Sequence, residues 1–152
     1  MSHEKTLFLE DLPVGTVLTS AARTITAQDI ADYCVLSGDH NPLHTDDEWV
    51  RANTPFRERI AHGLLVLGAS SGTPCPEMDS LLIVAYLSEA RNFRAPTYPG
   101  EAITTTWEVV ESRASKSKPD QGLVRLAVTC TKQDGTVVQD GEDLLLVSRR
   151  PA

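Results

Sequence analysis

The sequence contains only three cysteines, Cys34, Cys75 and Cys130, and no two of them form a CxxC motif. Closely and regularly spaced cysteines are typical of disulfide-rich secreted proteins and of zinc sites. This sparse pattern therefore predicts reduced thiols in a cytoplasmic protein. It excludes a disulfide framework and gives no support to a cysteine metal site.

Positive charge and long apolar runs are also scarce. The 152 residues carry a formal net charge of −7, whereas a nucleic-acid surface needs clustered Lys and Arg. The longest apolar runs, such as residues 81–87, are far shorter than the roughly 20 residues that span a membrane. The N-terminal tail around His3 lacks the apolar region of a signal peptide. We expect neither a nucleic acid nor a membrane as a partner.

What the sequence does contain is a helical first half followed by a β-rich second half. Thr26 and Asp29 form a capping-box pattern that predicts a helix ending near Gly38. Residues 62–72 are apolar on nearly all sides and include small residues, which predicts a buried helix. From Leu81 onward, four segments rich in Val, Ile and Thr alternate partly with period two and are joined by short turns.

Consecutive strands with short turns predict an antiparallel sheet, and helices that precede strands favour an α+β fold. No repeat or low-complexity linker divides the chain. We therefore expect one domain over residues 1–152, with the long sheet wrapped around the glycine-bearing helix.

The stretch SGDHNPLHTDDEW, residues 37–49, concentrates polar groups in few positions. Pro42 opposes helix, so the motif is expected to be a loop, and Asp46 or Asp47 to cap a short helix after it. Taken alone, Asp39 and His44 fit a capped polar turn, a metal site or an acid/base pair. Zinc sites show spaced His and Cys ligands, a spacing that is absent here, so no metal is expected.

The motif SGDHNPLHTD, followed by FRERIAHGLL, ASSG and FRAPTYPGEAI, resembles the MaoC-like dehydratases, also called hydratase 2 or R-specific enoyl-CoA hydratases. The resemblance extends over most of the chain. It implies a hot-dog fold, an antiparallel sheet around a central helix, assembled as a homodimer or as dimers of dimers. It also implies reversible hydration of a trans-2-enoyl thioester to an (R)-3-hydroxyacyl thioester, with CoA as part of the substrate and no separate cofactor.

The resemblance implies that Asp39 and His44 activate the attacking water, and the residue types suit this chemistry. Hydration needs a base for the water proton and an acid for C2, tasks suited to a carboxylate and an imidazole. It also implies that the Gly63 N–H holds the thioester oxygen, at a helix N-terminus where unpaired N–H groups lie. Ser71 matches a serine that orients the aspartate.

Other polar residues receive smaller roles. Asn41 is expected to support the loop, His62 to be a structural neighbour of Gly63, and His40 to be exposed. Lys116 and Lys118, on a polar loop, are the preferred candidates for contacts with CoA phosphates, ahead of Arg91 and Arg94.

Two other functions stay open at this point. A hot-dog thioesterase would release free thiol, although such enzymes generally lack the SGDxNPLH loop. A non-catalytic acyl-thioester-binding subunit would be expected to have lost Asp39 or His44. After Ser71 the segment TPCPEMDS replaces a longer apolar helix, so acyl-chain length is left open, as are the choice between CoA and acyl carrier protein and the direction of reaction.

Overall fold

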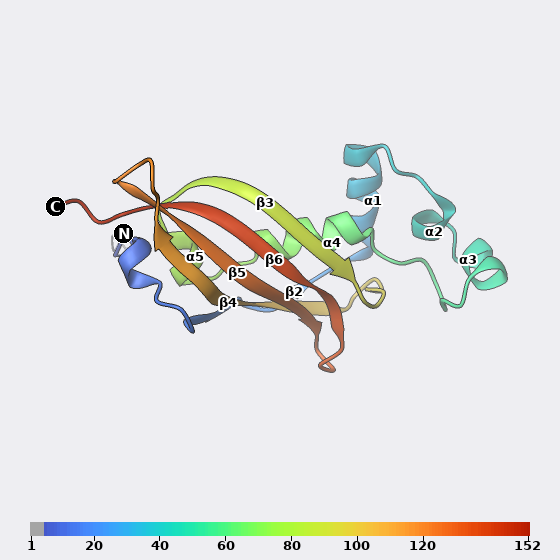
Figure 1. Ribbon diagram of the computed structural model, residues 1–152. Coiled ribbons are helices and arrows are strands. Elements are labelled where there is room, and N and C mark those ends of the chain that lie inside the picture. Colours follow the sequence, from blue (N-terminus) through green and yellow to red (C-terminus); the bar gives the residue numbers. More distant parts are fainter. Residues whose placement is uncertain (1–4) are drawn as a thin grey trace.

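A computed structural model describes residues 5–152 of the chain, so His3 lies outside the described residues (Figure 1). One antiparallel sheet has the strand order β1-β4-β5-β6-β3, with β2 paired to β4. Its strands are β1 (Val17–Thr19), β2 (Arg23–Thr24), β3 (Ile83–Phe93), β4 (Ala102–Ala114), β5 (Gln121–Lys132) and β6 (Val137–Ser148). The four strands predicted after Leu81 are confirmed.

The helices lie almost entirely in the first half. They are the 3-10 helix η1 (Leu9–Asp11) and the α-helices α1 (Ala27–Ser37), α2 (Pro42–Thr45), α3 (Asp47–Asn53), α4 (Gly63–Gly72) and α5 (Pro76–Ser80). None of the helices in residues 5–152 is long and apolar enough to cross a membrane.

The predicted limits of α1 are confirmed by its caps. Thr26 accepts a hydrogen bond from the Asp29 N–H, and the Asp29 carboxylate accepts one from the Thr26 N–H. Gly38 ends the helix in the left-handed conformation, at φ 78°, which costs glycine little. This turn directs the chain from α1 into the polar motif.

The expectation that the whole motif is a loop is wrong for residues 42–45, which form α2. Pro42 occupies the first helical position, where its missing N–H would have had no helical partner and its fixed φ suits the helix. The Asn41 side chain caps this short helix by accepting from the Leu43 N–H at 3.0 Å. Asp46 then caps α3, as predicted.

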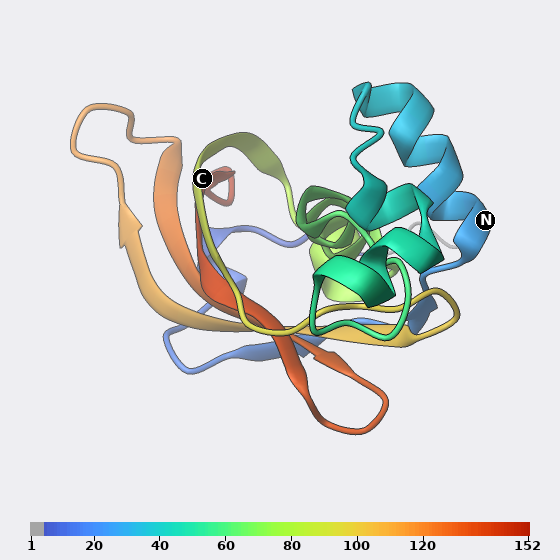
Figure 2. The same ribbon diagram turned by 90° about the vertical axis from the view of Figure 1, so that its right-hand side faces the viewer.

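The sheet curves around α4, the arrangement predicted for the glycine-bearing helix (Figure 2). Val66 and Ser70 are its buried residues, and Val66 packs in a cluster with Ile103 and Val138 of the sheet. The expectation of burial on nearly all sides is wrong for this chain alone, because Leu64 is 61% exposed. An apolar helix that the sheet covers on one side leaves its other side available.

The two ends of the sheet carry different parts of the chain. Helices α1 to α3 lie near the start of α4, whereas both described chain ends and the β4–β5 turn lie at the opposite end of the sheet (Figure 1). The polar motif and the first residues of α4 thus meet at one end of the molecule.

Candidate active site

Asp39 is held by its own loop. Its backbone N–H donates to Ser37 Oγ at 3.1 Å, and its Oδ1 accepts from the Asn41 N–H at 3.1 Å. These local bonds follow directly from the left-handed turn at Gly38 and fix the direction of the carboxylate. The Asp39 side chain remains 52% exposed, so solvent and ligands can reach it.

His44 is presented by α2 and is almost fully buried, at 9% exposure. Its Nδ1 lies 2.8 Å from the Ile60 carbonyl oxygen. A carbonyl can only accept, so Nδ1 carries the proton and a neutral His44 has its lone pair on Nε2. That nitrogen lies 3.9 Å from Asp39 Oδ2. The two atoms thus face each other without a direct hydrogen bond, which leaves both available to one ligand.

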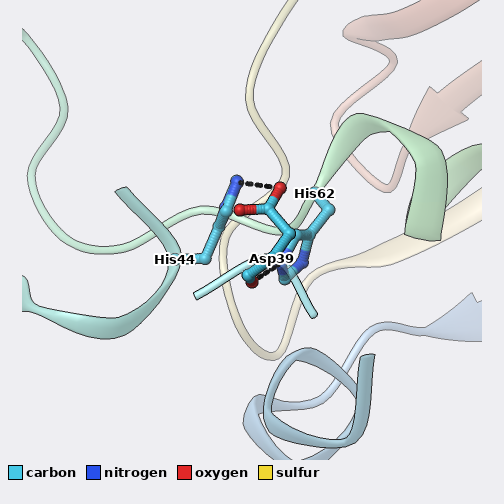
Figure 3. A group of neighbouring side chains, drawn as sticks. All are labelled: Asp39, His44 and His62. Atoms are coloured by element: carbon cyan, nitrogen blue, oxygen red, sulfur yellow. Dashed lines mark hydrogen bonds and ion pairs between the residues drawn. The ribbon is translucent and has the colours of Figure 1, made fainter. Parts of the chain in front are cut away.

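His62 joins the pair from the residue before α4 (Figure 3). It is 3% exposed, its Nε2 donates to the Asp39 carbonyl oxygen at 3.0 Å, and its ring stacks on His44 with centroids 3.7 Å apart. Burial lowers the pKa of His62, against the opposing effect of the Asp39 carbonyl. The sequence interpretation of His62 as a neighbour of Gly63 did not reveal that it contacts both members of the pair.

Asp39, His44 and His62 present possible ligand atoms within 4.8 Å of one another. Carboxylate and imidazole are donor types that zinc accepts, so the cluster could hold a metal ion by composition. The expectation that no metal takes part came from ligand spacing in the sequence, and it stays a prediction that chelation can test.

Gly63 begins α4 within contact distance of the sheet. The hydrogen bonds of residues 5–152 include none from the Gly63 N–H, as expected at a helix N-terminus. The Gly63 carbonyl accepts from Gln139 Nε2 at 2.7 Å. A Cβ at Gly63 would lie 2.8 Å from the Phe93 ring, so a larger residue here would have to displace that ring.

A cavity of about 460 Å³ begins beside these residues and includes both His44 and Gly63. Most of its remaining wall is apolar, from Leu43, Phe56, Ile60, Leu64 and Phe93. His44 also lines a second cavity of about 320 Å³ on the side of α1. The larger cavity is the one that joins the histidine to the start of α4, so it can hold a ligand that touches both.

Within one chain, three predicted site residues do not lie beside Asp39 and His44. Ser71 is exposed and donates to the Leu67 carbonyl at 3.0 Å, one turn earlier in α4. Lys116 and Lys118 are exposed in the β4–β5 turn, at the far end of the sheet from α2 (Figure 1). An orienting role for Ser71 and phosphate contacts for the two lysines stay predictions.

Comparison with known proteins places this arrangement in a family. The family described as "MaoC like domain" matches residues 10–131. The chain belongs to the MaoC-like dehydratase family. It is 36% identical over 149 residues to a 3-hydroxybutyryl-CoA dehydratase of Methylorubrum extorquens, covering 96% of this chain and 87% of the relative. It is 33% identical over 146 residues to an (R)-specific enoyl-CoA hydratase of Rhodospirillum rubrum, covering 94% and 93%.

Solved structures agree with this membership. A MaoC-like dehydratase from Rhodospirillum rubrum superimposes with a TM-score of 0.79 at 28% identity, over 96% of this chain and 99% of that one. A Mycobacterium tuberculosis protein described as a double hotdog fold gives a TM-score of 0.85 at 23% identity, over 96% of this chain and 45% of that one. The predicted α+β hot-dog fold and the predicted enzyme class, hydro-lyase, are confirmed.

Proposed function

We propose that this MaoC-like chain catalyses the reversible hydration of a trans-2-enoyl-CoA to an (R)-3-hydroxyacyl-CoA. The observation that carries the proposal is the pairing of Asp39 Oδ2 with His44 Nε2 at 3.9 Å, in a site that also includes the start of α4. The family membership and the hydratase and dehydratase relatives support the same chemistry.

In the hydration direction, a water molecule lies between the carboxylate and the imidazole. The pair removes one proton from it while the oxygen forms a bond to C3, and the C2=C3 electrons move toward the thioester carbonyl. The pair then delivers one proton to C2, so its protonation state is restored. Positioned acid–base groups of this kind typically contribute about 10²- to 10⁴-fold in rate. Dehydration follows the same steps in reverse.

The developing enolate oxygen is placed at the Gly63 N–H. This donor has no partner among the hydrogen bonds of residues 5–152, and the positive end of the ten-residue α4 favours negative charge there. One such donor is typically worth about 3 kcal/mol in the transition state. The bond from Gln139 to the Gly63 carbonyl keeps the first turn of the helix in place.

The chain acts as a cytoplasmic homodimer in this proposal. Strand β3 is an edge of the sheet, and its apolar residues Val84, Tyr86 and Leu87 are between 46% and 51% exposed. An unpaired, apolar edge strand needs cover, and a second copy supplies it symmetrically. The exposed side of α4 at Leu64 lies next to the same strand in the cavity wall formed with Phe93. Three buried free cysteines agree with a reducing compartment.

The direct test follows the loss of enoyl absorbance when purified protein meets crotonyl-CoA, with a thiol-trapping reagent in a parallel reaction. Loss of the double bond without free thiol is expected, also after treatment with a chelator. Thiol release would establish a thioesterase instead. Binding of crotonyl-CoA without either change would identify a non-catalytic subunit.

A further inference from the structure

Two residues in the wall of the 460 Å³ cavity each have a buried side-chain polar atom without a hydrogen-bond partner in residues 5–152. The two atoms are Thr97 Oγ1 and Gln139 Oε1. Thr97 is 3% exposed and Gln139 is 2% exposed. Leaving such a group unpaired in the interior is destabilising. Their occurrence in the wall of an otherwise largely apolar cavity indicates that a bound molecule completes their hydrogen bonds.

The chemistry of that molecule follows from the contacts already made. Gln139 Nε2 donates to the Gly63 carbonyl, which fixes the amide orientation and makes Oε1 the free acceptor. The ligand must therefore bring an N–H or O–H donor. The Thr97 backbone carbonyl accepts from the Ala61 N–H at 2.8 Å, which holds the Thr97 hydroxyl in place to donate or accept. An amide group supplies a matching donor and acceptor.

The chemistry of the two sides of a thioester decides which part carries this amide. A thioester carbonyl has two substituents, C2 and sulfur. With its oxygen at the Gly63 N–H, C2 and C3 lie toward Asp39 and His44, so the sulfur and the chain beyond it leave in the other direction. Gln139 contacts Gly63 from β6, an element other than the one that carries His44. Pantetheine carries two amide groups and a simple acyl chain carries none, so the unpaired atoms match the thiol portion of the substrate.

We propose that this cavity binds the pantetheine arm of the substrate, with Gln139 Oε1 accepting from an amide N–H and Thr97 Oγ1 donating to an amide carbonyl. This assignment rests on the proposed function. Arg94 lines the same cavity, and its contacts with Asp140 are both made through Nε. Its side chain is 54% exposed, so the two Nη groups stay available to a phosphate at the outer end of the arm. Because CoA and acyl carrier proteins share this arm, the subsite serves both carriers.

The test compares three crotonyl thioesters: crotonyl-CoA, crotonyl-pantetheine and S-ethyl thiocrotonate, which has no amide. Thr97→Val removes the hydroxyl and keeps the shape. Two ratios are measured: kcat/KM for crotonyl-CoA and kcat/KM for crotonyl-pantetheine, each divided by kcat/KM for S-ethyl thiocrotonate. Loss of one neutral hydrogen bond should lower both ratios by roughly fivefold to tenfold. Thr136→Val, the same change in the exposed β5–β6 turn, should leave both ratios at their wild-type values.

If Thr97→Val lowers kcat/KM equally for all three thioesters, Thr97 only supports Ala61. If it lowers kcat/KM for none of them, the hydroxyl has no ligand. Either result overturns the subsite. If wild-type protein hydrates none of them, the proposed function fails separately. Binding of butyryl-CoA and of pantetheine, measured by titration calorimetry, then decides. Weaker binding of both by Thr97→Val supports the subsite, and equal binding overturns it.

Discussion

Asp39 and His44 are held by the fold in different ways. His44 is buried and its tautomer is set by the Ile60 carbonyl. The Asp39 carboxylate is half exposed and accepts from the Asn41 N–H, while the Asp39 backbone N–H donates to Ser37 Oγ. His62 links them, since it stacks on the imidazole and donates to the Asp39 backbone. The proposed acid–base pair is therefore supported by a third side chain, His62, whose contacts the sequence motif did not reveal.

A second group of ionisable side chains lies away from the site, between β3, β6 and α4. Glu89 and Asp143 are direct partners in the β3–β6 register, and Arg91 contacts both carboxylates and Ser70. Burial, followed by the bond to Asp143, raises the pKa of Glu89 to about 7 from 4.5. Two carboxylates placed opposite each other favour sharing one proton.

This raised pKa predicts a pH dependence of stability. The unfolded chain releases the Glu89 proton near 4.5 and the folded chain near 7, so the folded state binds more protons between these values. The contribution of Glu89 to the free energy of unfolding is therefore full below about pH 4.5 and is lost as pH rises through about 7. In urea unfolding, the wild-type protein should have a lower free energy of unfolding at about pH 8 than at about pH 5. Glu89→Gln should make this difference smaller.

Glu108→Gln is the matched control, because Glu108 is an exposed carboxylate on β4. It should keep the wild-type pH dependence. If the free energy of unfolding decreased equally with pH in wild-type protein and in both variants, the Glu89–Asp143 pair would not hold a shared proton. Burial lowers the pKa of His62, so this residue reduces the free energy of unfolding as pH falls below the usual pKa of histidine. Because this effect opposes that of Glu89, the comparison between variants is the informative quantity.

At the scale of elements, the proposed oxyanion contact depends on the first turn of α4. Gly63 is covered by the Phe93 ring and anchored by Gln139. Gly63→Val would place its side chain against Phe93 and displace the N–H that faces the ligand. We expect kcat/KM for crotonyl-CoA to fall by about a hundredfold, the typical effect of losing one oxyanion donor.

The double variant Gly63→Ala with Phe93→Ala separates the two causes. Removing the ring makes room for a Cβ, so the double variant should recover much of the activity lost in Gly63→Ala alone, as coupled neighbours do. Wild-type kinetics in Gly63→Val would contradict the oxyanion assignment.

The sequence predicted most elements, and its errors have physical reasons. Period-two alternation and turn residues identified β3 to β6, and the capping box identified α1. The short helix α2 was missed because Pro42 opposes helix everywhere except at the first position. The exposed side of α4 was missed because composition does not reveal which face a sheet leaves uncovered.

The candidate site was predicted unevenly for a related reason. Asp39, His44 and Gly63 belong to a local motif and its continuation, so their grouping was visible in the sequence. Gln139 and Thr97 lie 76 and 34 positions from Gly63 and meet the site only through the β6 register and the turn after β3. Single polar residues in a strand or turn give no signal of such a contact.

At the scale of the whole molecule, the β3 edge predicts the assembly. Leu87 is 47% exposed in this strand, and a charge there should prevent a second copy from covering it. Sedimentation of wild-type protein should give the mass of a dimer, and Leu87→Glu should give that of a monomer. Val110→Glu, at a 40% exposed position on β4, should remain dimeric. A monomeric wild-type protein, or a dimeric Leu87→Glu, would contradict the proposed interface.

The measurement that tests the central claim most directly is the turnover of crotonyl-CoA by Asp39→Asn, beside wild-type protein and Asp32→Asn. The change at Asp39 preserves volume and removes the carboxylate that faces His44, and Asp32 is an exposed carboxylate on α1. We predict that kcat falls at least about a hundredfold in Asp39→Asn, with unchanged thermal unfolding, because a positioned acid–base group is lost. Asp32→Asn should hydrate at the wild-type rate. Near-wild-type turnover in Asp39→Asn would contradict the Asp39–His44 mechanism.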